Sequence, residues 1–300
     1  MSVLKTGSSK NYLHDYRDGK IKQGLGIGSQ KMDKHIRFKI GQFVGILGGA
    51  NYGKTYFATW YFLCLATQHN LKFCLWLDEN SKGQIMRNLI QMYSGINYMK
   101  LSHEQIDFYA EQIEQWFTFV DNLRPYTPNE LLEVFNTVSA DGYFVDPFNQ
   151  LNHDMTYNSN IEFIRNLKRW CKTNKKTVYL SMHPVTSAGR KISEYPKGHD
   201  WEGHPMIPSK SMAEGGAIFG NMCDDWINVH RLPKLDTMKN YTLIDIDKIK
   251  DNDTGGLQTT TDEVIMCYFN DGLGFKIDGV ECIKRQQIEK IKPFKQNFDF

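Results

Sequence analysis

The chain has 300 residues, of which 41% are hydrophobic and 23% charged, and its formal net charge is +2. These values are ordinary for a globular protein and fit either one large α/β domain or two small ones. A net charge so close to zero excludes a protein that binds nucleic acid through bulk positive charge, so any such interface must be a local cluster of cations.

The cysteines and the apolar runs exclude several further classes of protein. The six cysteines are scattered without a C-x-x-C pair, so a zinc site is not expected. No apolar run approaches the roughly eighteen residues of a membrane span, and the N-terminus lacks the apolar segment of a signal peptide. We therefore expect a cytoplasmic protein with no membrane partner.

The first 35 residues are polar and rich in glycine, which predicts an N-terminal arm rather than core. Within them, Gly24–Gly28 resembles part of a dinucleotide-binding fingerprint, but it precedes the first apolar strand instead of following one. We therefore reject a dinucleotide site. The expected organisation is an arm over residues 1–35, one domain over 36–280, and a peripheral tail over 281–300.

The most informative motif follows the first apolar run, residues 43–47, which predicts a buried strand. The motif reads G-x-x-x-x-G-K-T and leads into residues 56–63, which favour a helix. In this context the loop's backbone N–H groups and the helix start form a phosphate site, with Lys54 on the β- and γ-phosphates and the Thr55 hydroxyl on Mg²⁺. The predicted nucleotide-binding residues are Gly48, Gly49, Ala50, Asn51, Tyr52, Gly53, Lys54 and Thr55.

Downstream, apolar runs alternate with amphipathic segments. We expect strands at 71–77, 142–146, 177–180, 225–230, 241–249 and 264–269, and helices at 81–93, 102–116, from 127, and at 160–172. This alternation predicts an α/β fold with a mostly parallel sheet covered by helices on both faces. The last two strands suggest an antiparallel hairpin at the edge of the sheet.

Several acidic residues fall where the predicted strands end, which is where ligands gather in an open α/β sheet. Asp146 suits a carboxylate that holds Mg²⁺, although an Asp before Pro147 also suits a turn. Asp78 and Glu79 follow the second strand, and one of them is expected to polarise the attacking water; the alternative is a helix cap with a solvated acid. His183 closes a strand and could contact the γ-phosphate, or it could be structural.

The segment from residue 187 to 210 combines cations with an aromatic ring and shows little periodicity. Cations that follow phosphates and a ring that stacks on bases are what single-strand binding requires. The alternative is a solvated loop, since three acids dilute its positive charge. The predicted DNA-binding residues are Arg190, Lys191, Lys197, Trp201 and Lys210.

Taken in order, these motifs resemble the RecA-type helicase domain of the DnaB family of hexameric replicative helicases, especially its phage primase-helicase branch. The resemblance starts near residues 22–28 and runs through the phosphate loop, Leu77–Asn80, Asp146 and His183. It continues in residues 213–218 and 225–227, which are similar to the family's RESGAI and ADVV stretches, although Ala213 stands where the family has Arg. Arg231 matches the arginine that closes the next strand.

The resemblance extends to Lys248–Gly255, which is similar to the family's K-x-R-x-x-x-T-G. It implies that Lys248 and a finger residue act in trans on the nucleotide of a neighbouring subunit. Lys250 occupies the finger position, where it keeps the charge but lacks the planar fork of arginine. Arg231 is the other candidate for this contact.

What the resemblance implies is a RecA-like P-loop ATPase that uses ATP, or another nucleoside triphosphate, with Mg²⁺. It would assemble into a homo-oligomeric ring, most simply a hexamer, around single-stranded DNA and unwind duplex DNA during replication, with a separate primase or loader as a further partner. If phage-encoded, it would work in the cytoplasm of a bacterial host. The alternatives are a RecA- or KaiC-like ATPase switch that does not unwind, and a non-catalytic loader, which the intact Lys54, Thr55 and Asp146 oppose.

Overall fold

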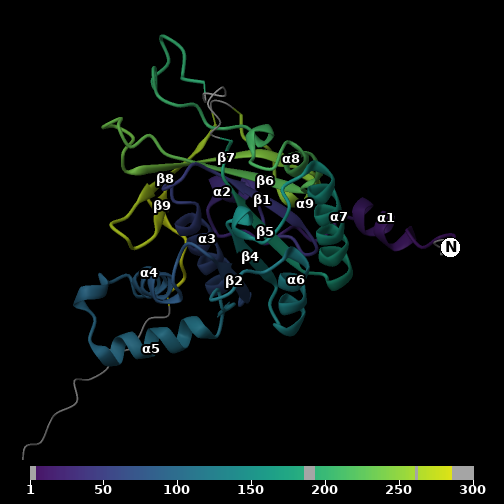
Figure 1. The fold of residues 1–300 in the computed structure, drawn as a ribbon, viewed down its shortest axis with the longest axis horizontal. Helices are drawn as coiled ribbons and strands as arrows, with labels where there is room; N and C mark the ends of the chain where they lie inside the picture. The colour runs from purple at the N-terminus through teal and green to yellow at the C-terminus, as the bar shows by residue number, and fades with distance from the viewer. Residues whose placement is uncertain (1–4, 186–192, 261–262, 286–300) are drawn as a thin grey trace, which may run out of the picture.

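A single large sheet runs through the described part of the chain, residues 5–185, 193–260 and 263–285 of a computed structural model (Figure 1). Its strand order is β10-β9-β8-β7-β6-β1-β5-β4-β2-β3. The strands are β1 (Phe43–Leu47), β2 (Phe73–Leu77), β3 (Phe117–Phe119), β4 (Gly142–Asp146), β5 (Thr177–Met182), β6 (Asp225–His230), β7 (Tyr241–Ile249), β8 (Ile265–Phe269), β9 (Phe275–Ile277) and β10 (Val280–Glu281).

The helices alternate with the parallel strands and then become short. They are α1 (Lys10–Arg17), α2 (Gln30–His35), α3 (Lys54–His69), α4 (Lys82–Ser94), α5 (His103–Glu114), α6 (Pro128–Thr137), α7 (Tyr157–Asn174), α8 (Ile218–Met222) and α9 (Asn252–Gly255). Helices α4, α5 and α6 each begin with a reciprocal capping box, at Ser81, Ser102 and Thr127, which satisfies free N–H groups of the first turn. These caps explain why the three helix starts could be predicted from the sequence.

The sheet has a parallel part and an antiparallel edge, as the sequence predicts. Strands β6, β1, β5, β4, β2 and β3 pair in parallel, whereas β7 to β10 pair antiparallel. The edge contains more than the expected hairpin, because the short strands β9 and β10 extend it. The sequence analysis did not predict strand β3 either, which pairs with β2 at the other edge of the sheet.

Both faces of the parallel strands are covered, because successive side chains point to opposite sides. One apolar cluster joins α3, α4 and α5 to one face, and a second joins α6, α7 and α8 to the other. Helix α3 is buried along most of its length, with Trp60, Phe62 and Leu63 fully enclosed. Both faces of the parallel strands therefore contribute to the core, and a ligand can approach them only at the strand ends.

The two halves of the segment 1–35 differ in burial. Helix α1 is exposed along its whole length, but Ile27 and Met32 are fully buried in the main core. The Asp33 carboxylate fixes this entry segment, accepting hydrogen bonds from the N–H groups of Ile27 at 2.7 Å and Gly28 at 2.9 Å. Two apolar side chains thus anchor the second half of this segment to the core. Ile283, in the predicted tail, is buried as well.

No helix in the described residues is both long enough and apolar enough to cross a membrane.

Candidate active site

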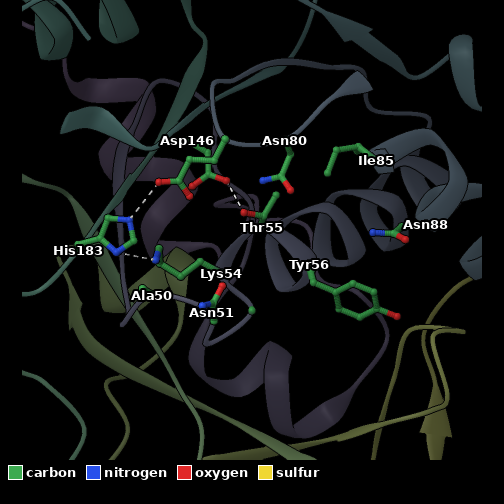
Figure 2. A pocket seen from close by; sticks show the side chains of 12 residues that line it. Ala50, Asn51, Lys54, Thr55, Tyr56, Asn80, Ile85, Asn88, Asp146 and His183 are labelled. Atoms are coloured by element: carbon green, nitrogen blue, oxygen red, sulfur yellow. Dashed lines mark hydrogen bonds and ion pairs between the residues drawn. The ribbon is translucent and has the colours of Figure 1, made fainter. Parts of the chain in front are cut away.

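An open cavity of about 380 Å³ lies at the carboxyl ends of the parallel strands, above the start of α3 (Figure 2). It brings together residues from the phosphate loop, from the ends of β2 and β4, and from the segment after β5. Its lining consists of Ala50, Asn51, Gly53, Lys54, Thr55, Tyr56, Glu79, Asn80, Ile85, Asn88, Asp146 and His183.

The phosphate loop is held open by backbone conformations that few residues adopt. Asn51 and Gly53 have φ angles of 61° and 85°, and a Cβ at Gly48 would lie 2.4 Å from the Val229 carbonyl oxygen. Gly48 is therefore required for the tight approach between the loop and β6, and Gly53 for its left-handed φ angle. Left-handed positions of this kind turn N–H groups toward one concavity, the arrangement that binds phosphate.

Lys54 is folded over this loop and is largely buried. Its ammonium donates to the carbonyl oxygens of Gly48, at 2.9 Å, and Gly49, at 3.2 Å. Burial lowers the pKa of Lys54, while Asp146 and Glu79 oppose that shift. A cation held by carbonyls at the mouth of a phosphate loop has its charge available for an anionic ligand.

Thr55 and Asp146 form the second part of the site. The Thr55 hydroxyl donates a hydrogen bond to the Asp146 carboxylate, which is 3% exposed at the end of β4. Burial raises the pKa of Asp146, opposed by the hydrogen bond from Thr55 and the charge of Lys54. A hydroxyl and a carboxylate at one point are oxygen ligands of the kind that Mg²⁺ prefers, so these residues fit the ion.

His183 joins Lys54 to Glu79. Its Nδ1 lies 3.2 Å from the Lys54 ammonium and its Nε2 lies 3.7 Å from the Glu79 carboxylate. Since an ammonium only donates, Nδ1 must accept, which leaves the proton on Nε2, on the side of Glu79. Burial and the charge of Lys54 lower the pKa of His183, so the ring is neutral at pH 7.

The two acids after β2 are placed differently. Glu79 lines the cavity, and its side chain is 49% exposed. Asp78 is exposed, and its N–H donates to the Asp146 carbonyl oxygen at 3.0 Å, which joins the backbones at the ends of β2 and β4. Among the described residues, the cavity lining includes Glu79 and not Asp78.

Lys248 and Lys250 lie at the amino ends of the parallel strands, which we call the opposite edge of the sheet because the cavity is at the carboxyl ends. Strand β7 runs antiparallel to β6, and its register pairs Trp226 with Lys248, at the start of β6. The Lys250 ammonium contacts the Asp224 carboxylate at 2.9 Å, and that of Lys248 donates to three carbonyls at the end of α8. Neither lysine is at the cavity of its own chain.

Arg231 follows β6 and is on the same edge as the phosphate loop. Its guanidinium donates to the Lys239 carbonyl oxygen at 2.9 Å. It does not line the cavity described above.

Only part of the predicted DNA-binding set falls within the described residues. Arg190 and Lys191 lie outside the described residues, and Lys197 is exposed. Trp201 is half-buried in a cluster with Tyr195 and His199, with ring centroids 5.2 and 5.5 Å away. The cluster shows that the loop folds back on itself and that packing already uses part of the indole surface.

Lys210 is also engaged within the chain. Its ammonium contacts the Asp247 carboxylate at 2.6 Å, and its N–H donates to the same side chain at 2.8 Å. The base of the loop is therefore attached to β7.

The segments that enter and leave this loop, residues 183–185 and 212–214, are hydrogen-bonded to each other. The Glu214 N–H donates to the His183 carbonyl oxygen at 2.8 Å, and the Val185 N–H donates to the Met212 carbonyl oxygen at 2.8 Å. Pro184 bridges Ala213 between them. The loop is thus clamped at its base directly beside the cavity.

Four cavity residues escaped the sequence analysis as site residues: Tyr56, Asn80, Ile85 and Asn88. Ile85 and Asn88 are three apart on α4 and so share one face of it. That spacing was a usable signal, but nothing in the sequence shows that α4 turns this face toward the phosphate loop.

Strand order, phosphate loop and carboxyl-edge cavity together define a RecA-like P-loop fold. Among solved structures, the chain is similar to one described as an ATPase domain. That structure has 16% identity and a TM-score of 0.71, and the alignment covers 92% of this chain and 100% of that one.

A second similar structure is a DnaB-like replicative helicase, described together with its interactions with primase. It shares 15% identity and a TM-score of 0.68, and the alignment covers 92% of this chain and 67% of that one. No family model and no curated protein matches the sequence. The chain has the fold of a DnaB-type helicase domain.

Proposed function

We propose that the protein is an ATP-driven replicative DNA helicase motor, which translocates on single-stranded DNA as a ring. The observation that carries this proposal is one cavity that gathers Lys54, the Thr55–Asp146 pair, Glu79 and His183. The fold adds support, since one similar solved structure is named as an ATPase domain and another as a DnaB-like replicative helicase.

The chemistry follows from the charges around the cavity. Thr55 and Asp146 would hold Mg²⁺, which when bound neutralises charge on the phosphate oxygens. Lys54 would turn from the loop carbonyls to the β- and γ-phosphates, because a polyanionic ligand attracts the ammonium more strongly than two neutral oxygens do.

Glu79 is the proposed general base. As a carboxylate that reaches the cavity from outside the phosphate loop, it would accept a proton from the attacking water while the γ-phosphate bond breaks. The neutral His183 presents its Nε2–H on the same side, where it can donate to Glu79 or to a γ-phosphate oxygen. Loss of the phosphate would therefore change the hydrogen bonding of His183.

A change at His183 would be passed to the loop that the segment 183–185 clamps. Because the clamp consists of backbone hydrogen bonds with 212–214, a shift of His183 moves the base of the loop directly. Lys197, Arg190 and Lys191 would then move against the phosphates of a single strand. This is the proposed coupling between hydrolysis and translocation.

Assembly into a homo-oligomeric ring, proposed to be a hexamer, would complete the site. Lys250 is far from its own cavity, so it can reach a phosphate only on a neighbouring subunit. The similar helicase structure was described with primase, which supports a separate primase as a proposed partner. We also propose a cytoplasmic location.

The second candidate function is a RecA- or KaiC-like ATPase switch without unwinding, favoured by the engagement of Trp201 and Lys210 within the chain. One experiment separates the two: hydrolysis of ATP with and without single-stranded DNA, strand separation of a forked duplex, and the mass in solution. Stimulated hydrolysis, strand separation and a ring support the motor. Hydrolysis without strand separation by an assembled ring contradicts it and supports the switch.

A further inference from the structure

The cavity has two chemically different ends. Lys54, Asp146 and His183 lie together on one side, whereas Tyr56, Ile85 and Asn88 lie on the other (Figure 2). The side chains at the second end carry no charge, and Ile85 is 3% exposed. A nucleoside triphosphate has the same asymmetry, with its negative charge at one end and a flat, neutral base at the other.

The uncharged end is rigid on the side of Tyr56. The Tyr56 oxygen accepts a hydrogen bond from the Gly274 N–H at 3.0 Å, and its ring packs on Phe269 and Phe275 with centroids 5.5 and 5.3 Å away. Burial raises the pKa of Tyr56 to about 12, so the phenol stays neutral. A base that enters beside it meets a fixed aromatic wall rather than a mobile side chain.

Asn88 differs from the other residues at this end because its amide is polar and free. It is half-buried on α4, and its side chain makes no hydrogen bond within the described residues. One amide presents a donor and an acceptor side by side, which matches the exocyclic amine and adjacent ring nitrogen of adenine. Leaving such a group unpaired beside a bound ligand would cost affinity.

We propose that the Tyr56–Ile85–Asn88 end binds the base of the nucleotide and that Asn88 sets a preference for adenine. The proposal rests on the proposed function, since it assumes that the triphosphate occupies the phosphate loop. The Tyr56 ring supplies most of the apolar contact that any base can use, since little of the Ile85 side chain is exposed, whereas the Asn88 amide hydrogen-bonds the edge of the base. Asn88 is therefore the specificity-determining residue.

The test compares binding of ATP, GTP, CTP, UTP and inorganic tripolyphosphate to the full chain by calorimetry with Mg²⁺. Wild type should bind ATP most tightly, and Asn88→Ala should lower ATP affinity about tenfold. Affinity for tripolyphosphate should not change, since it has no base. Arg87→Ala, an exposed neighbour on the same helix, is the matched control and should bind like wild type.

The outcomes separate this inference from the proposed function. Equal losses of ATP and tripolyphosphate affinity in Asn88→Ala, or an unchanged ATP affinity, overturn the base assignment. Equal wild-type affinity for all four nucleotides overturns the adenine preference. Failure of wild type to bind even tripolyphosphate contradicts the phosphate site itself, and with it both proposals. Asn88→Gln, which keeps the amide, should recover part of the preference.

Discussion

Charged residues cluster at both the carboxyl and the amino ends of the parallel strands, but their partners differ. At the carboxyl edge, Lys54 donates to loop carbonyls, and Glu79 is half exposed beside an open cavity. At the opposite edge, the buried Asp225 contacts Lys39 at 3.1 Å, and Asp224 contacts both Lys168 and Lys250.

The comparison shows that clustered charge by itself does not mark a site. The Lys39–Asp225 and Lys168–Asp224 pairs at the opposite edge are largely buried and complete within the chain, whereas Lys250 is substantially exposed and its partner Asp224 also has Lys168. A buried pair of this kind must remain matched, because an uncompensated buried charge is costly. The cavity edge instead offers charges whose present partners a ligand can replace.

The most severe test of the cavity edge is Lys54→Ala. Hydrolysis should fall below detection, because no other described lysine or arginine lines the cavity to neutralise the phosphates. Steady-state phosphate release measures the effect. Lys82→Ala removes an exposed lysine paired with Glu114 and serves as the control. Activity retained by Lys54→Ala would show that the cavity is not the hydrolytic site.

The second test distinguishes the two acids after β2. Glu79→Gln should bind nucleotide normally and turn over about 10³-fold more slowly, because the water loses its base. Asp78→Asn should leave turnover within a few-fold of wild type. Single-turnover hydrolysis beside nucleotide affinity makes the comparison. The reverse ranking of the two variants would assign the base to Asp78.

The third test asks whether Lys250, at the opposite edge, acts on the cavity of a neighbouring subunit. Lys250→Ala should lower hydrolysis in the assembled ring about a hundredfold and leave nucleotide affinity intact, because Lys250 acts on a neighbour's phosphate. Mixing Lys250→Ala with Lys54→Ala subunits should restore activity that neither has alone, whereas Lys239→Ala, at an exposed ion pair, should behave as wild type.

If mixed rings form and no activity returns, the finger assignment is wrong and Arg231 becomes the candidate. Lys250→Arg should equal or exceed wild type, because a planar fork contacts two phosphate oxygens at once.

A smaller effect is expected from the loop beside the cavity. Neutralising Arg190, Lys191 and Lys197 together should weaken single-strand binding about tenfold and reduce its salt slope by roughly 2, because fewer counterions are released. Hydrolysis without DNA should persist. The matched control neutralises Lys82, Lys100 and Lys234, which are exposed elsewhere. An unchanged salt slope in the loop variant would remove the loop from the DNA path.

A separate test concerns the stability of the fold rather than activity. His230 is fully buried, donates through Nε2 to the Pro205 carbonyl oxygen at 2.9 Å, and has its pKa lowered by burial from 6.5 to about 4. The unfolded chain therefore binds more protons between pH 6.5 and 4, so stability falls as the pH falls through that window. The loss should approach about 3 kcal/mol.

Urea unfolding at several pH values measures this loss. The slope between pH 6.5 and 4 should flatten in His230→Gln and remain in His14→Gln, whose site on α1 is exposed. An unaltered slope in His230→Gln would assign the acid sensitivity to other groups.

Much of the fold could be predicted, because its signals are local. Apolar runs marked β1, β2, β4 and β5, and capping residues marked α4, α5 and α6. The features that the sequence did not predict depend on contacts between distant parts of the chain. Strand β3 has only three residues and forms because β2 offers a free edge. Ile27 and Met32 are isolated apolar residues in a polar segment, so only tertiary packing reveals that they are core.

The candidate site likewise has residues that local sequence signals predict and residues whose contacts they do not. Lys54, Thr55, Asp146, Glu79 and His183 were predictable because a glycine motif and strand ends locate them, and the structure brings them to one cavity. Their catalytic roles remain predictions. The engagement of Trp201 and Lys210 within the chain was not foreseeable, because Tyr195 and Asp247 contact them through folding of a segment without periodicity.

The pairing of Gly45 with Trp226 has a consequence for how the sequence can vary. A Cβ at Gly45, in the middle of β1, would lie 2.2 Å from the Trp226 ring, whose Nε1 donates to Asn228 at 2.8 Å. The indole is fixed by that hydrogen bond and cannot withdraw. Positions 45 and 226 should therefore covary among relatives, with a larger residue in β1 tolerated only where the residue at 226 is smaller.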